Sequence, residues 1–132
     1  MSRFSFNTVA LFTTDNSAMV KFYCDIFDFE TNWNGIDLNV EMHLGDMRLL
    51  LFPRQSFEEM TSQKFTYPSG INGTMELSFD VPTYADVDKE YDRAVGMGAT
   101  PIFEPTTEPW GQRTCYVADP EGNLIEISSF VM

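Results

Sequence analysis

Hydrophobic and polar residues in the first part of the chain follow two different periods in succession. Residues 6–13 (FNTVALFT) are rich in β-branched and aromatic side chains, a composition typical of a strand. Residues 14–27 then place apolar side chains at helical spacing, with Asp15 or Asn16 as the expected N-cap. This pattern predicts a strand followed by a helix.

Three short strands are predicted after this helix, at 29–33, 37–45 and 47–55. The last two form a hairpin, because Gly45-Asp46 lies between them as a turn signal. Residues 56–65 have the composition of a single helical turn. Residues 66–73 contain one Pro and two Gly and are predicted to form a loop that ends the first half.

The second half repeats the same order of elements. Residues 73–82 form a predicted strand and 83–98 a helix, in which Thr83 is the N-cap and Asp86 occupies the third helical position. Three more strands follow, at 99–105, 112–119 and 123–130. An Asp-Pro-Glu-Gly sequence makes the tight turn between the last two.

The repeated order predicts an α+β fold built from two βαβββ modules. A chain of 132 residues and 15.1 kDa is long enough for one domain, and 43% of its residues are hydrophobic, enough to build a core. We therefore expect a single domain of two modules, the first spanning 1–65 and the second 66–132.

Net charge narrows the possible partners. Eight basic and twenty acidic side chains give a formal charge of −12, which repels nucleic acid and anionic membranes, so neither is an expected partner. The acidity serves solubility or attracts a cationic ligand. Neither a secretory leader nor a metal or redox spacing of the two Cys is recognisable, which favours a cytoplasmic protein with free thiols.

Two segments carry a family resemblance. The C-terminal PWGQRTCYVADPEGNLIEI and the N-terminal NTVALFTTDNSAMVKFYCDIFDF are similar to signatures of the vicinal oxygen chelate superfamily. That family includes glyoxalases, bleomycin-resistance proteins, fosfomycin-resistance enzymes and extradiol dioxygenases. The resemblance implies curved mixed sheets that enclose a cavity, in a protein that is usually a homodimer. Because such folds host several chemistries, function must be sought in the cavity itself.

In metal-dependent members of the family, four ligands lie on the first and last strands of the two modules. The corresponding positions here are Thr8, Thr74, Glu126 and Leu49, or Leu50 if the strand register differs by one. Two hydroxyls, one aliphatic side chain and one carboxylate are a poor ligand set for a divalent ion, so we expect no metal and no other cofactor.

The single histidine leaves two interpretations open. His43 is either an ordinary sheet residue or a metal ligand outside the family pattern, paired with Glu41 on the same strand face. Strand alternation places Glu126 and Glu76 on the cavity side. There Glu126 could accept a hydrogen bond from Thr8, Thr74 or Arg113, meet a ligand amine, or be held by water at the cavity mouth. The two carboxylates together could act as an acid and base or bind a cation.

Aromatic residues complete the candidate site. Phe12 and Trp33 fall on predicted strands, and Trp110 lies in a loop, either as a lid over the cavity or as a dimer contact. We expect a metal-free, homodimeric protein that binds an aromatic or cationic small molecule. The predicted ligand-binding residues are Thr8, Phe12, Trp33, His43, Leu49, Thr74, Glu76, Trp110, Arg113 and Glu126. The alternatives are a glyoxalase-like lyase or isomerase that uses a divalent metal or an acidic pair, and a regulatory module without chemistry.

Overall fold

The computed structural model describes residues 2–132 and groups them in two compact units, one ending at Thr66 and one beginning at Tyr67. Each unit contains a four-stranded open sheet with both parallel and antiparallel pairs. In each unit the chain runs strand, helix, and then three strands. The predicted α+β class with two βαβββ modules is therefore confirmed.

The first unit is built on a sheet with the strand order β1-β4-β3-β2. Its elements are β1 (Val9–Thr13), α1 (Asn16–Phe27), β2 (Glu30–Thr31), β3 (Val40–Leu44), β4 (Met47–Pro53) and α2 (Arg54–Thr61). Strand β1 is parallel to β4, and the other pairs are antiparallel. Gly45, with a φ of 56°, turns the hairpin between β3 and β4 where the sequence predicts it.

Side chains of α1 and of one sheet face form the core of the first unit. Asp15 caps α1 by accepting a hydrogen bond from the backbone N–H of Ala18 at 3.0 Å. Leu49 and Leu51 are only 3% and 0% exposed, so both belong to this core. The structure thus places Leu49 on the helix-covered face and not on the open face, where we expected it. Leu50, one residue further along, takes the open position.

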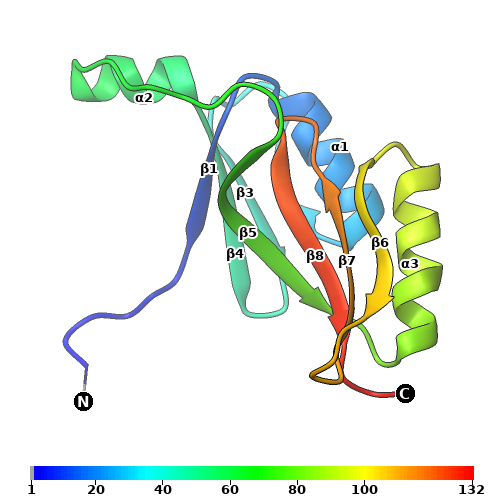
Figure 1. Cartoon of the computed structure of the whole chain (residues 1–132). Helices are drawn as coiled ribbons and strands as arrows, with labels where there is room; N and C mark the ends of the chain where they lie inside the picture. The colour runs from blue at the N-terminus through cyan, green and yellow to red at the C-terminus, as the bar shows by residue number, and fades with distance from the viewer. Residues whose placement is uncertain (1) are drawn as a thin grey trace. The chain divides into compact units, whose positions relative to one another are not determined.

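Two elements of the first unit differ in length from the prediction. Strand β2 has two residues because the hydroxyl of Thr31 donates to the carbonyl of Glu41 at 2.7 Å and accepts from the N–H of Trp33 at 3.2 Å. These bonds replace further sheet pairing. Helix α2 has eight residues, more than the single turn predicted, and leads away from the end of β4 (Figure 1). The ring of Phe57 on α2 lies 4.6 Å from that of Phe12.

The second unit repeats this plan with the strand order β5-β8-β7-β6. Its elements are β5 (Asn72–Asp80), α3 (Tyr84–Gly96), β6 (Thr100–Thr107), β7 (Arg113–Ala118) and β8 (Asn123–Ser129). Helix α3 lies along one face of the sheet (Figure 1). The carboxylate of Asp86 accepts from the backbone N–H of Thr83 at 3.1 Å, which confirms the predicted capping pair.

The turn between β7 and β8 is fixed by close backbone contacts. The N–H of Gly122 donates to the carbonyl of Asp119 at 2.9 Å, as a tight turn requires. Gly122 has a φ of 90°, and a Cβ on it would lie 2.0 Å from the carbonyl oxygen of Gly70. The N–H of Asn72 in turn donates to the carbonyl of Gly122 at 2.9 Å. The first residue of β5 is thereby joined to this turn.

Hydrophobic stretches in the helices are short. Over residues 2–132, no helix has the length and apolar character that crossing a membrane demands.

Candidate functional site

Alternation on β8 separates a core face from an open face in the second unit. Ile125 and Ile127 are 0% and 2% exposed on the side covered by α3, so Glu126 between them points to the other face. The sheet register sets Glu126 beside Ser78 on β5 and beside Tyr116 on β7. On this open face the structure brings together five polar side chains, here called the carboxylate cluster: Glu76, Ser78, Thr114, Tyr116 and Glu126.

Two hydroxyl groups connect the two carboxylates of the cluster. Ser78 Oγ lies 2.7 Å from Glu76 Oε2 and 3.0 Å from Glu126 Oε1. The hydroxyl of Tyr116 lies 3.1 Å from Glu76 Oε1 and 3.2 Å from Glu126 Oε2. Each hydroxyl has one proton to donate and faces two acceptors, so the carboxylates are poorly supplied with donors where they meet. A ligand that brings N–H or O–H donors would be favoured there.

Burial and neighbouring charges also change the pKa of the phenol in the cluster. The pKa of Tyr116 is raised well above the usual tyrosine range, first by burial and then by the negative charges of Glu126 and Glu76. The phenol therefore stays protonated and remains a donor at neutral pH. Glu126 has two further donors on Oε2, the hydroxyl of Thr114 at 2.7 Å and the side-chain amide of Gln112 at 3.3 Å.

Arg113 lies on the opposite face of β7 from this cluster. Its Nε and one terminal nitrogen each donate to Asp88 on α3 at 2.7 Å, which lowers the pKa of the Asp88 carboxyl. Arg113 therefore pairs with Asp88 and not with Glu126, which was one of its expected partners. Thr74 is exposed on β5, in the stretch where the register with β8 shifts.

Trp110 lies in the connection between β6 and β7, and its side chain is 65% exposed. Here the backbone N–H of Glu108 donates to the carbonyl of Gln112 at 2.7 Å, and the N–H of Gly111 donates back to the carbonyl of Glu108 at 3.0 Å. The hydroxyl of Tyr84 on α3 also donates to the carbonyl of Gly111. These bonds close residues 108–112 into a turn, which we call the 108–112 turn.

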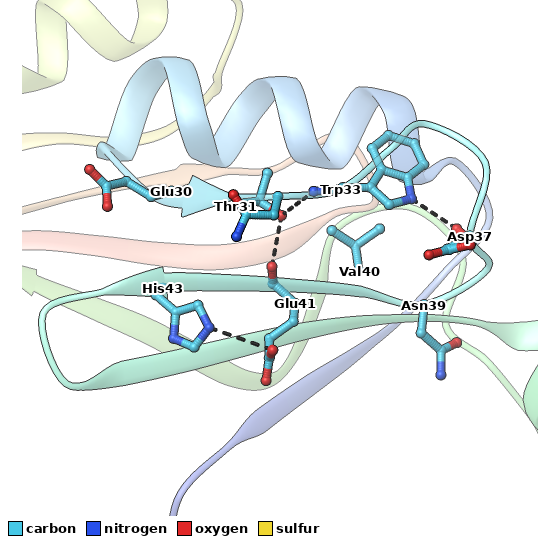
Figure 2. Close-up of a pocket in the computed structure, with 9 residues that line it drawn as sticks. Glu30, Thr31, Trp33, Asp37, Asn39, Val40, Glu41 and His43 are labelled. Atoms are coloured by element: carbon cyan, nitrogen blue, oxygen red, sulfur yellow. Dashed lines mark hydrogen bonds and ion pairs between the residues drawn. The ribbon is translucent and has the colours of Figure 1, made fainter.

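The first unit contains a polar pocket of about 670 Å³, here called the Trp33 pocket (Figure 2). It is lined by Glu30, Thr31, Asn32, Trp33, Asp37, Asn39, Val40, Glu41 and His43. The indole N–H of Trp33 donates to the backbone carbonyl of Asp37 at 2.8 Å, which fixes the ring in the wall. The structure thus brings together Trp33 and His43, two of the predicted binding residues.

Negative charge predominates in this pocket. Three carboxylates line it, from Glu30, Asp37 and Glu41, and His43 Nε2 lies 3.6 Å from Glu41 Oε2. Arg48 contacts the other oxygen of Glu41 at 2.5 Å and compensates one of the three charges. The pocket therefore suits a cation better than an anion.

Two predicted residues of the first unit lie outside the lining of this pocket. Thr8 is half-buried just before β1. Phe12 packs with aromatic rings of β4 and α2, at 6.0 Å from Phe52 and 4.6 Å from Phe57. Phe12 therefore belongs to an aromatic cluster on the open face of the first sheet.

The four positions that the family resemblance matches to metal ligands do not provide a ligand set here. Leu49 is aliphatic and buried, Thr8 and Thr74 offer only neutral hydroxyls, and Glu126 supplies the one carboxylate of the four positions. Within residues 2–132, no group of three or more His, Cys, Asp and Glu side chains is placed to hold a metal ion. These residues do not fit a divalent ion.

Sequence reasoning found both carboxylates of the cluster but missed three of their partners. Two signals in the sequence could have identified these partners, which are Gln112, Thr114 and Tyr116. Period-2 alternation puts them on one face of β7 and the residue before it. The tight turn at Gly122 fixes the register that sets Tyr116 opposite Glu126.

Comparison with known proteins relates these features to one family. The family model described as Glyoxalase/Bleomycin resistance protein/Dioxygenase superfamily matches residues 5–127. No curated protein matches the chain. Several solved structures do.

A glyoxalase/bleomycin resistance protein/dioxygenase family enzyme from Burkholderia phytofirmans PsJN is 29% identical, with a TM-score of 0.81 over 95% of this chain and 98% of that one. A hypothetical protein, SA1046 from S. aureus, is 20% identical, with a TM-score of 0.77 over 100% and 95%. A lactoylglutathione lyase from Agrobacterium tumefaciens is 24% identical, with a TM-score of 0.72 over 94% and 92%. The last two are similar in fold alone.

Proposed function

Since the chain belongs to the glyoxalase/bleomycin resistance protein/dioxygenase superfamily, we propose that it is a small-molecule-binding protein whose ligand is an aromatic cation. The ligand occupies the Trp33 pocket and is held without a metal ion. The observation that carries this proposal is the combination of an indole wall and three carboxylates around one hollow.

The size and the chemistry of the pocket support this class of ligand. Its volume of about 670 Å³ lies within the roughly 300–1,000 Å³ of sites that take drug-sized molecules. The ring of Trp33 is already fixed by its bond to Asp37, so ligand binding orders little additional side-chain freedom. A cation against an indole gains roughly 0.5–2 kcal/mol. The formal charge of −12 also attracts cations over a distance.

A fluorescent dye tests the proposal. Thioflavin T is a planar aromatic cation, and its emission on binding is measured for the wild type and for two single substitutions. Trp33→Leu should weaken binding about twofold to thirtyfold, because the cation–π contact is lost. Trp110→Leu is the matched control, since it removes the other tryptophan outside the pocket and should leave affinity unchanged. Equal affinity in both variants would overturn the assignment of the pocket.

Elemental analysis tests the metal-free part of the proposal. The protein should be purified without a His-tag or chelator, and we expect far less than one metal ion per chain. About one tightly held divalent ion per chain would contradict this part. It would favour a metal-dependent lyase or isomerase that uses His43, Glu41 or Glu126.

A second candidate function is acid–base catalysis by an isomerase or lyase in the second unit. The observation that favours it is the single phenol of Tyr116 within 3.2 Å of both Glu76 and Glu126. A carboxylate beside a protonated phenol offers a base and an acid at one place. With S-lactoylglutathione as the test substrate, Glu126→Gln should abolish any turnover of the wild type. Turnover that survives this substitution would exclude the acid–base role.

We also propose that two chains assemble as a homodimer, as the family resemblance implies, and that the protein works in the cytoplasm, where the thiols of Cys24 and Cys115 would stay reduced. Sedimentation equilibrium measures this directly, and a monomer at micromolar concentration would contradict it.

A further inference from the structure

A chain of side-chain hydrogen bonds connects the exposed indole of Trp110 to the carboxylate of Glu126. The indole N–H donates to Gln112 Oε1 at 2.9 Å, and Gln112 Nε2 donates to Glu126 Oε2 at 3.3 Å. Gln112 closes the 108–112 turn through its backbone carbonyl as well. One residue therefore contacts the turn, the indole and the carboxylate cluster.

The chemistry of the three groups fixes the orientation of the amide. An indole N–H can only donate, and an ionised carboxylate can only accept. The amide of Gln112 must therefore direct its oxygen to Trp110 and its nitrogen to Glu126. If the amide were rotated by 180°, its NH₂ group would face the indole N–H of Trp110 and its oxygen would face the carboxylate of Glu126.

The two oxygens of Glu126 accept different numbers of hydrogen bonds. Oε2 accepts from Gln112 at 3.3 Å, from Thr114 at 2.7 Å and from Tyr116 at 3.2 Å. Among residues 2–132, Ser78 alone donates to Oε1, at 3.0 Å, and that hydroxyl is also 2.7 Å from Glu76. The donors of Gln112 and Thr114 alone match the two lone pairs of Oε2, and Tyr116 is a third neighbour. Oε1 is the atom that can accept a proton or hydrogen bond from a bound molecule.

We propose that Gln112 is a positioning residue that holds Glu126 with Oε1 available and couples the carboxylate to Trp110. A change in the charge or occupancy of Glu126 weakens the bond that orients the amide, and the indole then loses its acceptor. The 108–112 turn thus responds to the state of Glu126. The coupling stands on the geometry, and its catalytic meaning rests on the acid–base function proposed above.

Two-dimensional ¹H–¹⁵N NMR measures the coupling on the intact protein, because the chain contains two tryptophans and hence two indole N–H signals. Trp33→Phe leaves one signal and so assigns that of Trp110. In Gln112→Leu this N–H should exchange with solvent about fivefold faster, which corresponds to one ordinary hydrogen bond. Glu126→Gln should shift the same signal. Asp88→Asn is the matched control, since it removes a carboxylate from the other face of the sheet and should leave the signal in place.

A charge exchange separates coupling from ordinary loss of structure. Gln112→Glu still accepts from Trp110 but sets two carboxylates against each other, so it should displace the signal. Adding Glu126→Gln restores the bond with donor and acceptor exchanged, and the signal should return toward its wild-type position and exchange rate. A merely structural role of Gln112 predicts additive effects without rescue, and that result would overturn the proposal.

Titration with S-lactoylglutathione distinguishes this proposal from the acid–base function. A shift of the Trp110 signal in the wild type that is absent in Gln112→Leu supports both. Rescue in the double variant without any response to the compound supports the coupling and counts against that substrate class.

Discussion

Replacing Gly122 with alanine tests the closest backbone contact of the second unit. Two costs act together in Gly122→Ala. A residue other than glycine at a φ of 90° costs about 1–2 kcal/mol. The new Cβ would also lie 2.0 Å from the carbonyl oxygen of Gly70, closer than any real Cβ contact. The backbone before β5 must therefore move away.

That movement breaks the bonds that join Asn72 to the turn. The backbone N–H and the side-chain amide of Asn72 donate to the carbonyl of Gly122 at 2.9 and 3.2 Å. Each bond is worth about 0.5–1.5 kcal/mol, which adds about 1–3 kcal/mol to the conformational cost. We expect Gly122→Ala to lower the free energy of unfolding by about 2–5 kcal/mol in urea titrations followed by circular dichroism.

Gly111 offers a matched control for this measurement. It lies in the same unit with a φ of 89°, and a Cβ on it would meet nothing within 4 Å. Gly111→Ala should therefore cost only the conformational part, about 1–2 kcal/mol. The two substitutions should differ by at least about 1 kcal/mol. Equal losses would refute the claim that contact with Gly70, rather than backbone conformation, makes Gly122 necessary.

Three further predictions follow from the shifted pKa values. Cys115 is buried, and burial raises the pKa of its thiol to about 12. Ellman's reagent should therefore react only with Cys24 in the native protein and with both thiols in urea. Two reactive thiols before unfolding would contradict this. The raised pKa of Tyr116 means that stability should fall as the pH rises above about 10, where the unfolded chain loses this proton first. In absorbance titration at alkaline pH, Tyr116→Phe should remove only the latest part of the tyrosine signal. Because the pKa of Asp88 is lowered in the folded protein, this carboxylate stabilises the fold above the usual aspartate pKa, and the stabilisation is lost on acidification. Asp88→Asn should therefore make the urea midpoint depend less on pH between about 6 and 3. An unchanged dependence of the midpoint on pH would show that the pair with Arg113 adds no stability.

Local chemistry was enough to predict most of the fold. The cap at Thr83 and the turn before Gly122 depend on neighbours in the sequence, so their residues alone reveal them. The lengths of β2 and α2 could not be read this way. Strand β2 ends where Thr31 bonds to Glu41, and α2 persists where Phe57 meets Phe12. Both depend on contacts between segments that are distant in the chain.

The candidate site was predicted in part for a related reason. Alternation placed Glu126 on the open face because the isoleucines on each side of it mark the core. For Leu49 no such contrast exists, since residues 49–52 are all apolar and either register buries a leucine. Arg113 begins its strand, where its long side chain reaches Asp88 on α3. Trp33 and His43 share one pocket through the loop between β2 and β3, whose path the pattern does not specify.

The parallel pairing of the first strand with the last strand of each unit has a consequence for synthesis on the ribosome. Val9 on β1 finds its partner Leu49 only after β4 has emerged, and Leu77 on β5 waits in the same way for Ile125. Until then each first strand has no parallel partner, and closing such a long loop slows folding. A vectorially made chain can complete its first unit before the second has a last strand to close on. Because the topology is repeated, the chain closes two shorter loops one after the other during synthesis, instead of one long loop.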